Sequence, residues 1–343
     1  MLALSLSVLS VIVRAVDTPG TSDAKVLAAE RGSLVEAIAA KLEAEYVFPN
    51  VATEMSDAIR VRAARGEYDS VQSAQELAKH LTADLCSVSH DKHLRVIYQA
   101  EGAHDEPEQP SADEIKAWRE AEAKVNFGFG AVERMDGNIG YLAFRHFASP
   151  TMAAEVASSA MSFIANTDAL IIDLRKNHGG DPDMVAYLAS YLFDERTHLN
   201  DIYIRRGDRL DQYWTAPYMP GQVFGGKKPV YILTSPETFS GAEDFTYALK
   251  NLKRAKIVGE VTRGGAHPTR PFKVTEHFEV AVPFARSISP ITHTDWEGTG
   301  VTPDVAVPAD DALKTAYTDA LKSIIATTTD ADQKEQLSKL LSK

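Results

Sequence analysis

The sequence contains a single cysteine, Cys86, among its 343 residues. One cysteine cannot form an intramolecular disulfide, and no Cys-x-x-Cys pair is present to hold a zinc ion. Leu85 and Val88 lie beside it, so we interpret Cys86 as a small apolar residue on a helix. A nucleophilic role is disfavoured because buried thiols without an activating neighbour are usually inert. The stability of the fold must therefore come from its hydrophobic core.

Positive charge is also scarce. The chain has 36 Lys and Arg against 48 Asp and Glu, which gives a net charge of −12, and its densest basic stretch, residues 250–256, holds only four basic side chains. An acidic surface without a basic patch repels a phosphate backbone. We therefore predict no nucleic-acid partner.

Long apolar runs are missing as well. The longest membrane-like segment, Leu2 to Val13, is apolar apart from serines, but a bilayer-spanning helix needs about 20 residues. Val13 and Ala15 fit the small-x-small cleavage pattern, although a basic n-region is lacking. We predict a signal peptide over residues 1–15, a periplasmic or extracellular protein, and no stable membrane insertion after cleavage. A misplaced start codon or a short hydrophobic helix are the alternatives.

The remaining sequence is that of an ordinary globular protein, with 44% hydrophobic and 24% charged residues. Its length predicts about two domains. Apolar residues recur at helical spacing over residues 20–96, which predicts a helical module. Residues 97–125 are rich in acidic residues, glycine and proline before a short helix, which predicts a linker. A core over 126–310 and C-terminal helices over 311–343 complete the predicted organisation.

Within 126–310 the pattern predicts an α/β fold. Asp136-Gly137 separates two alternating runs, as in a β-hairpin. Three short apolar runs, 169–174, 230–234 and 257–259, alternate with helical segments, and a further pair of strands is expected around 272–282. Strands separated by helices form right-handed βαβ units, so the sheet should be mostly parallel.

The first candidate for chemistry follows the strand 169–174. The segment Asp173-Leu-Arg-Lys-Asn-His-Gly-Gly180 ends in paired glycines, which let backbone N–H groups approach a ligand and suit an oxyanion hole. Asp173 and Arg175 are placed to brace the turn by pairing. A simple strand-ending turn remains the alternative.

The second candidate follows the strand 230–234. In Thr238-Phe-Ser-Gly-Ala-Glu243, a serine at a strand-to-helix turn places its hydroxyl near the positive end of a helix. The alternative makes Ser240 an N-cap, with Glu243 completing a capping box. The motif is not Gly-x-Ser-x-Gly, because Thr238 replaces the first glycine.

A nucleophilic serine needs a base, and ten histidines compete for that role. His90 and His93 flank Asp91, His178 lies in the glycine turn, and His267 follows Gly264-Gly265. Metal binding is the rival interpretation of His90 and His93, but their spacing is common by chance. We therefore predict no metal and no cofactor.

Four motifs occur in order between residues 126 and 310: Asp173-Leu-Arg-x-Asn-x-Gly-Gly180, Thr238-Phe-Ser-Gly-Ala-Glu243, Val258-Gly-Glu260 and Gly300-Val-Thr-Pro-Asp304. Together they resemble the tail-specific (C-terminal processing) serine peptidase family. The resemblance implies a crotonase-like α/β core. The N-terminal motifs Tyr46-Val-Phe-Pro49 and Asp91-Lys-His-Leu94 resemble a branch that includes bacterial homologues of the interphotoreceptor retinoid-binding protein. No stretch resembles the PDZ domain of many members.

The resemblance implies that Ser240 is the nucleophile and that the N–H groups of Gly241 and of Gly179 or Gly180 form the oxyanion hole. In the Ser/Lys branch a lysine is the base, but Gly265 stands at that position. Arg263 is no substitute, because its guanidinium stays protonated. A Ser/Lys dyad at this position is therefore excluded.

Another branch, typified by the tricorn core protease, uses an N-terminal histidine, which His93 matches, and a glutamate, which Glu297 matches. The serine that precedes that histidine is Lys92 here. The implied activity is hydrolysis of peptides or proteins through an acyl-enzyme, with His93 rather than His267 as the expected base. A non-catalytic binder of apolar ligands or peptides and a small-ester hydrolase are the alternatives, and the sequence does not determine the oligomeric state.

Overall fold

The structure of the chain is a computed structural model that describes residues 28–103 and 111–342. The predicted signal peptide lies outside the described residues. Among those that are described, no helix is long and apolar enough to cross a membrane.

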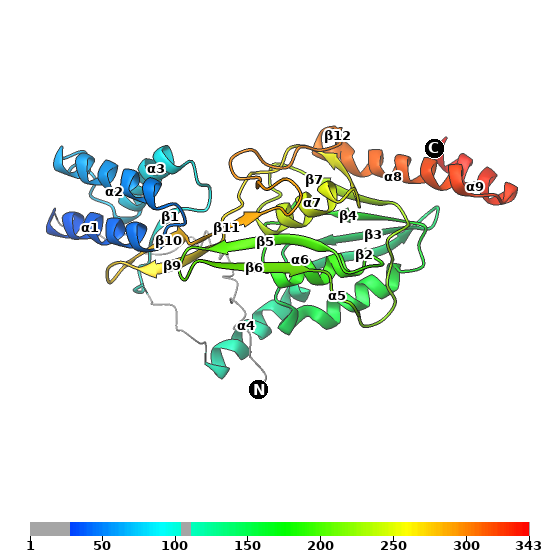
Figure 1. The fold of residues 1–343 in the computed structure, drawn as a ribbon, viewed down its shortest axis with the longest axis horizontal. Coiled ribbons are helices and arrows are strands. Elements are labelled where there is room, and N and C mark those ends of the chain that lie inside the picture. The colour runs from blue at the N-terminus through cyan, green and yellow to red at the C-terminus, as the bar shows by residue number, and fades with distance from the viewer. Residues whose placement is uncertain (1–27, 104–110, 343) are drawn as a thin grey trace.

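The N-terminal part folds as three helices, as predicted: α1 (Ala28–Glu45), α2 (Pro49–Ala64) and α3 (Ala74–Ser89). Pro49 lies in the first turn of α2, where its missing N–H costs nothing. The Ser73 hydroxyl caps α3 by accepting the N–H of Glu76. The helices bury their apolar faces against one another, through side chains that include Ile38, Met55 and Leu81. Figure 1 shows them at one end of the molecule.

A small antiparallel sheet completes this end of the molecule with strands from far along the chain. Its order is β1 (Arg95–Tyr98), β10 (Phe278–Pro283) and β9 (Thr269–Lys273). Val96 pairs with Val280, and Val280 and Val282 are buried in the same apolar cluster as the helices. Residues from within the range 126–310 therefore pack on the N-terminal helices.

The central sheet is mixed and mostly parallel, which confirms the predicted fold class. Its order is β12 (Val305–Ala306), β8 (Lys256–Gly259), β7 (Val230–Thr234), β4 (Ala169–Asp173), β3 (Ile139–Phe144) and β2 (Phe129–Met135). Only β2 and β3 pair antiparallel, across the predicted turn at Asp136-Gly137. The other neighbours are parallel.

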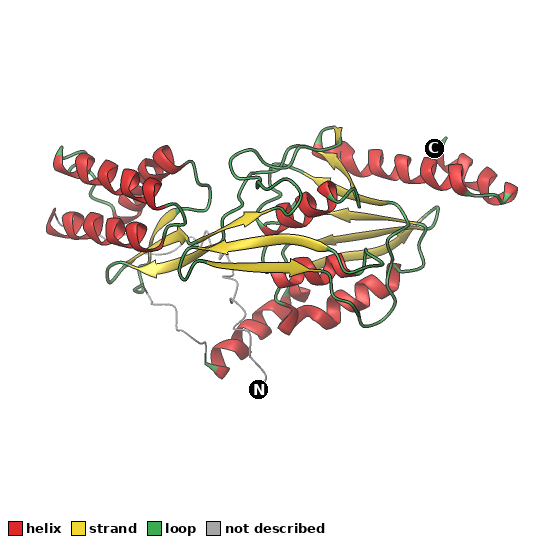
Figure 2. Ribbon diagram, in the orientation of Figure 1, coloured by secondary structure: helices red, strands yellow, loops and turns green. Residues whose placement is uncertain are grey.

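Helices cover both faces of this sheet (Figure 2). Leu170 and Ile172 pack in a cluster with α5 (Pro150–Ile164), α6 (Pro182–Ser190) and α7 (Gly241–Asn251). Ala169 and Ile171 point to the opposite face, where they meet α8 (Ala309–Thr327) and α9 (Ala331–Leu341). Alternate side chains of β4 are thus buried in two separate hydrophobic cores, because successive residues of a strand point to opposite faces of the sheet.

Three further pieces complete the described chain. The helix α4 (Ala112–Lys124) follows the acidic linker, and a 3₁₀ turn (Asn126–Gly128) leads into β2. A separate antiparallel sheet consists of β11 (Ala285–Ile288), β5 (His198–Ile204) and β6 (Arg209–Trp214). Its strands β5 and β6 were not predicted from the sequence.

Parallel neighbours β4 and β7 end at the same edge of the central sheet. The turns that follow them, 174–181 and 235–240, therefore lie side by side. They carry the two glycine- and serine-containing motifs.

Candidate active site

Ser240 occupies a strained turn immediately before α7. Its backbone has φ 55° and ψ −121°, a region that residues with a Cβ atom rarely adopt. An ordinary N-cap residue has extended backbone angles, so capping does not require this conformation. Ser240 does occupy the N-cap position of α7, with Glu243 accepting its N–H as in the capping box considered above, but its backbone conformation is not one that capping requires.

The Glu243 carboxylate holds this turn in place. It accepts the N–H of Ser240 at 2.9 Å, the N–H groups of Gly264 and Gly265 at 2.6 and 2.8 Å, and the Thr262 hydroxyl. Burial raises the pKa of Glu243. The carboxylate oxygens of Glu243 accept backbone N–H groups from both the serine turn and the loop that follows β8. Glu243 therefore holds these two segments together.

The glycine turn after β4 touches Ser240 directly. A Cβ atom on Gly179 would lie 2.7 Å from the Ser240 Cβ and 2.5 Å from the Gly241 nitrogen. A Cβ on Gly241 would lie 3.0 Å from the Gly180 nitrogen. Only residues without side chains allow this approach, because real Cβ contacts are longer.

The N–H groups of the glycine turn have different uses. The N–H of Gly179 donates to the Asn177 side chain at 2.9 Å. Within the described part of the chain, the structure gives the N–H groups of Gly180 and Gly241 no acceptor. Asp173 and Arg175 brace the turn as expected: the guanidinium donates to both carboxylate oxygens at 2.9 and 2.6 Å. Burial raises the pKa of Asp173, but Arg175 outweighs it and lowers the pKa overall.

His93 reaches this edge of the sheet from the loop between α3 and β1. Its side chain is 3% exposed, and its ring stacks on Phe239, the neighbour of Ser240, at a centroid distance of 4.4 Å. Neither ring nitrogen has a hydrogen-bond partner among the described residues, so no hydrogen bond joins His93 to Ser240 in this structure. Burial lowers the pKa of His93 to about 4, which keeps the imidazole uncharged at neutral pH.

Gly265 explains how His93 fits. A Cβ atom at position 265 would lie 2.6 Å from the His93 Cε1 and 2.2 Å from the Phe239 Cε2. The two rings therefore fill the space that any side chain at position 265 would need. The lysine expected at this position in the Ser/Lys branch and the buried His93 ring are mutually exclusive.

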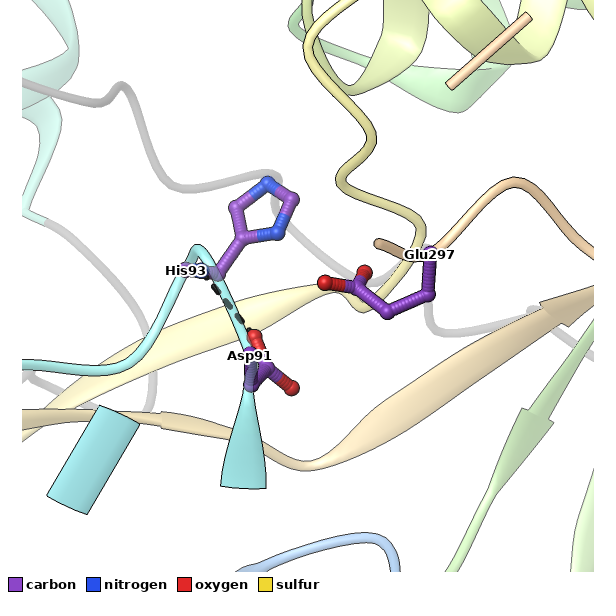
Figure 3. A group of neighbouring side chains, drawn as sticks. All are labelled: Asp91, His93 and Glu297. Atoms are coloured by element: carbon purple, nitrogen blue, oxygen red, sulfur yellow. Dashed lines mark hydrogen bonds between the residues drawn. The ribbon is translucent and has the colours of Figure 1, made fainter. Parts of the chain in front are cut away.

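Glu297 lies beside His93 (Figure 3). Its carboxylate accepts the N–H of Ala266 and, at 3.3 Å, the N–H of Lys92. One nitrogen of the His93 ring faces this carboxylate. Burial and the nearby Asp91 raise the pKa of Glu297 to about 7. The structure thus places two of the residues singled out from the sequence, His93 and Glu297, beside each other, and it stacks the His93 ring on Phe239, the residue before Ser240.

Asp91 is a central residue that the sequence did not identify as functional. It is 1% exposed and accepts the His93 N–H at 3.0 Å, the Tyr46 hydroxyl at 3.2 Å and His267 Nδ1 at 2.6 Å. Burial raises the pKa of Asp91, but the bond to His267 outweighs it and lowers the pKa. The same bond raises the pKa of His267 against the effect of burial. The two residues therefore form a buried hydrogen-bonded pair, which is an ion pair when His267 is protonated. Asp91 lies two residues before His93 in the motif Asp91-Lys-His-Leu94. Its place in that motif was the one feature of the sequence that could have indicated a functional role.

The other sequence candidates lie elsewhere. His90 is exposed at the C-terminus of α3, in the left-handed conformation, and does not join the Asp91–His93–Glu297 group. His178 is exposed on the glycine turn. Cys86 lies on α3, half-buried, and burial raises the pKa of its thiol, in agreement with a non-nucleophilic role.

The fold and the site define an α/β protein with a serine on a tight strand-to-helix turn, packed against a glycine turn, and with a buried histidine stacked on the residue before that serine. Comparison with known families agrees. Residues 138–307 match peptidase family S41, and residues 25–126 match the N-terminal domain of peptidase S41 in eukaryotic IRBP, the interphotoreceptor retinoid-binding protein. The chain belongs to peptidase family S41.

Individual relatives are more distant. The chain is 33% identical over 145 residues to the chloroplastic carboxyl-terminal-processing peptidase 2 of Arabidopsis thaliana, covering 42% of this chain and 27% of the relative. It is 24% identical over 203 residues to a carboxyl-terminal-processing protease of Picosynechococcus, covering 59% and 47%. The chain thus spans less than half of the length of these two relatives.

One solved structure extends the likeness to most of the fold. The photosystem II D1 C-terminal processing protease superposes with a TM-score of 0.51 at 18% identity, covering 82% of this chain and 94% of that one. At this identity the superposition shows a shared fold and no more.

Proposed function

We propose that the chain is a serine peptidase that hydrolyses peptides or proteins through an acyl-enzyme, with a histidine as its base. The observation that carries the proposal is the placement of the buried His93 ring, in the space left by Gly265, on Phe239, which directly precedes Ser240 in its strained turn. Family membership supports a peptidase, and the local geometry supports the choice of base.

In the proposed reaction the Ser240 oxygen attacks the carbonyl carbon of the scissile peptide bond. A nitrogen of His93 accepts the hydroxyl proton and returns it to the departing amine as the C–N bond breaks. Water then attacks the acyl-enzyme in the same way, releases the acid and restores Ser240. Glu297 faces the His93 ring and orients it. Because no Ser240–His93 hydrogen bond is formed in this structure, the bond must form when substrate binds, as is common in enzymes.

The negative charge that develops on the carbonyl oxygen during the attack must be stabilised by hydrogen-bond donors that are already in position. The N–H groups of Gly180 and Gly241 suit this role, since they lie close together and lack acceptors in the described chain. The N–H of Gly179 donates to the Asn177 side chain, so we assign it no part in binding this oxygen. Gly179 matters because it has no side chain that would collide with Ser240.

The nucleophile is tested by labelling with a serine-directed fluorophosphonate. The wild-type chain should be labelled and should cleave members of a peptide library, and Ser240→Ala should do neither while unfolding at nearly the same urea concentration. If Ser240 were only an N-cap, the substitution would lower the free energy of unfolding by about 0.5–2 kcal/mol. Labelling that persists in Ser240→Ala would refute the proposal. Labelling of the wild type without cleavage of any peptide would instead indicate an ester hydrolase.

The base is tested by comparing His93→Ala with His267→Ala. We expect His93→Ala to abolish turnover, and His267→Ala to reduce it, since His267 is engaged by Asp91. If His267→Ala is inactive and His93→Ala keeps wild-type turnover, the assignment of the base is wrong.

The proposal includes export of the protein, based on residues 2–15. The mature protein recovered from the periplasm or medium should then begin after Ala15. An intact N-terminus by mass spectrometry would contradict export by a cleaved signal.

A further inference from the structure

Three potential metal ligands meet beside the serine turn. One atom each of Asp91, His93 and Glu297 can be chosen such that all three lie within 4.8 Å of one another. Figure 3 shows the side chains converging from two loops, one before β1 and one before β12. These loops are some 200 residues apart in the sequence, which is why no local spacing predicted the group.

The donors are of the kind that a divalent transition metal binds. One imidazole and two carboxylates are common protein ligands for Zn²⁺. Bonds of about 2.0–2.2 Å around a tetrahedral ion place its ligand atoms roughly 3.5 Å apart, so closure by about 1 Å completes the site. Lys92, which lies between two of the ligands in the sequence, turns its ammonium away to the carbonyl of Arg263.

A second observation points to a missing partner. His93 is 3% exposed, yet neither ring nitrogen has a hydrogen-bond partner among the described residues. Buried polar groups without partners are costly. The site also places two carboxylates close together, and His267 Nδ1 lies 2.6 Å from Asp91 and 3.6 Å from Glu297. His267 already donates to Asp91, and carboxylates that bind a metal are commonly held in place by such hydrogen bonds.

We propose that Asp91, His93 and Glu297 bind a divalent transition-metal ion such as Zn²⁺, and that the bound ion inhibits the enzyme. The inhibitory part rests on the proposed function. A neutral imidazole has one nitrogen lone pair, and the other nitrogen carries a proton. A metal that takes this lone pair leaves only an N–H, which cannot accept the proton of Ser240. Metal binding and base catalysis therefore compete for one lone pair.

Metal binding is tested without relying on activity. The Ser240→Ala chain, which keeps all three ligands, is titrated with Co²⁺ and followed by its visible absorption bands. We expect one Co²⁺ per chain, displaced by Zn²⁺. Glu297→Gln should weaken binding at least about tenfold. The matched control His90→Asn, which removes a nearby exposed imidazole but suits a left-handed backbone, should bind as tightly as the parent.

A folded Glu297→Gln chain, checked by circular dichroism, that binds Co²⁺ as tightly as the parent overturns the site, as does absence of binding to the parent. If Glu297→Gln does not fold, His93→Asn provides the second ligand variant, judged in the same way.

Inhibition is tested on the wild-type chain with a peptide substrate. Zn²⁺ should abolish turnover at the concentration at which it displaces Co²⁺, and a chelator should restore it. Zn²⁺ that binds without reducing turnover overturns the inhibitory role. If the wild type cleaves no peptide but binds Co²⁺ through Glu297, the metal site is supported and the proposed function fails.

Discussion

Replacing Gly265 with alanine adds one methyl group at a point where the structure has no space for it. The new Cβ would lie 2.2 Å from the Phe239 ring and 2.6 Å from the His93 ring, whereas ordinary contacts begin near 3.4 Å. The rings must therefore move by about 1 Å, and a displacement of this size in a catalytic group can cost about 10²-fold in rate. Overpacking a buried site also costs about 1–3 kcal/mol. We expect kcat to fall about 100-fold and the free energy of unfolding to fall within that range.

The assay is steady-state turnover of a peptide substrate, with urea unfolding measured on the same preparations. Gly32→Ala is the matched control, since it makes the same chemical change on an exposed helix position where the new Cβ meets nothing within 4 Å. It should leave kcat unchanged and raise the free energy of unfolding by about 0.5–1 kcal/mol. A folded Gly265→Ala enzyme with wild-type kcat would show that the His93 ring does not act from this position.

Two other buried groups give predictions about stability. Asp91→Ala should lower the free energy of unfolding by about 3–5 kcal/mol, because it leaves His267 buried without its partner. The double variant Asp91→Ala/His267→Ala should lose less stability than the sum of the losses in the two single variants. Additive losses would show that the two residues do not interact. Burial raises the pKa of Asp244 to about 7, so the unfolded chain ionises first as the pH rises and stability falls between about pH 4 and pH 7. Asp244→Asn should remove this loss, of about 4 kcal/mol at most, so that urea unfolding at pH 8 shows a gain in stability that is absent at pH 4. A difference between the two proteins that does not vary with pH would mean that folding does not raise the pKa of Asp244.

The edge of the central sheet was predictable because it depends on local patterns. Short apolar runs such as 169–174 and 230–234 specify buried strands, and parallel neighbours end at one edge, which brings the turns at Gly179 and Ser240 together. The Asp173–Arg175 ion pair could be predicted in the same way, because its two residues are only two positions apart in the sequence.

The surroundings of the histidine were not predictable from local patterns. The Asp91–His267 bond joins residues 176 positions apart, and it depends on β1 pairing with β10, which no local period specifies. Likewise, β6 is largely solvent-exposed, so it lacks the apolar alternation by which a half-buried strand is recognised. The resemblance identified His93 and Glu297, but only packing reveals that Gly265 makes room for His93.

The pairing of β1 with β10 also bears on how the chain acquires its site during synthesis. The N-terminal helices emerge early, but Val280 and Val282, which complete their apolar cluster, emerge some 180 residues after Val96, the β1 residue that pairs with Val280. Contacts of such long range close late, because the loop between them must first be ordered. We therefore expect His93 to reach its place on Phe239 after the central sheet has formed around the serine turn. Under the proposed function, a nascent chain that already displays Ser240 still lacks its base until β10 has been synthesised.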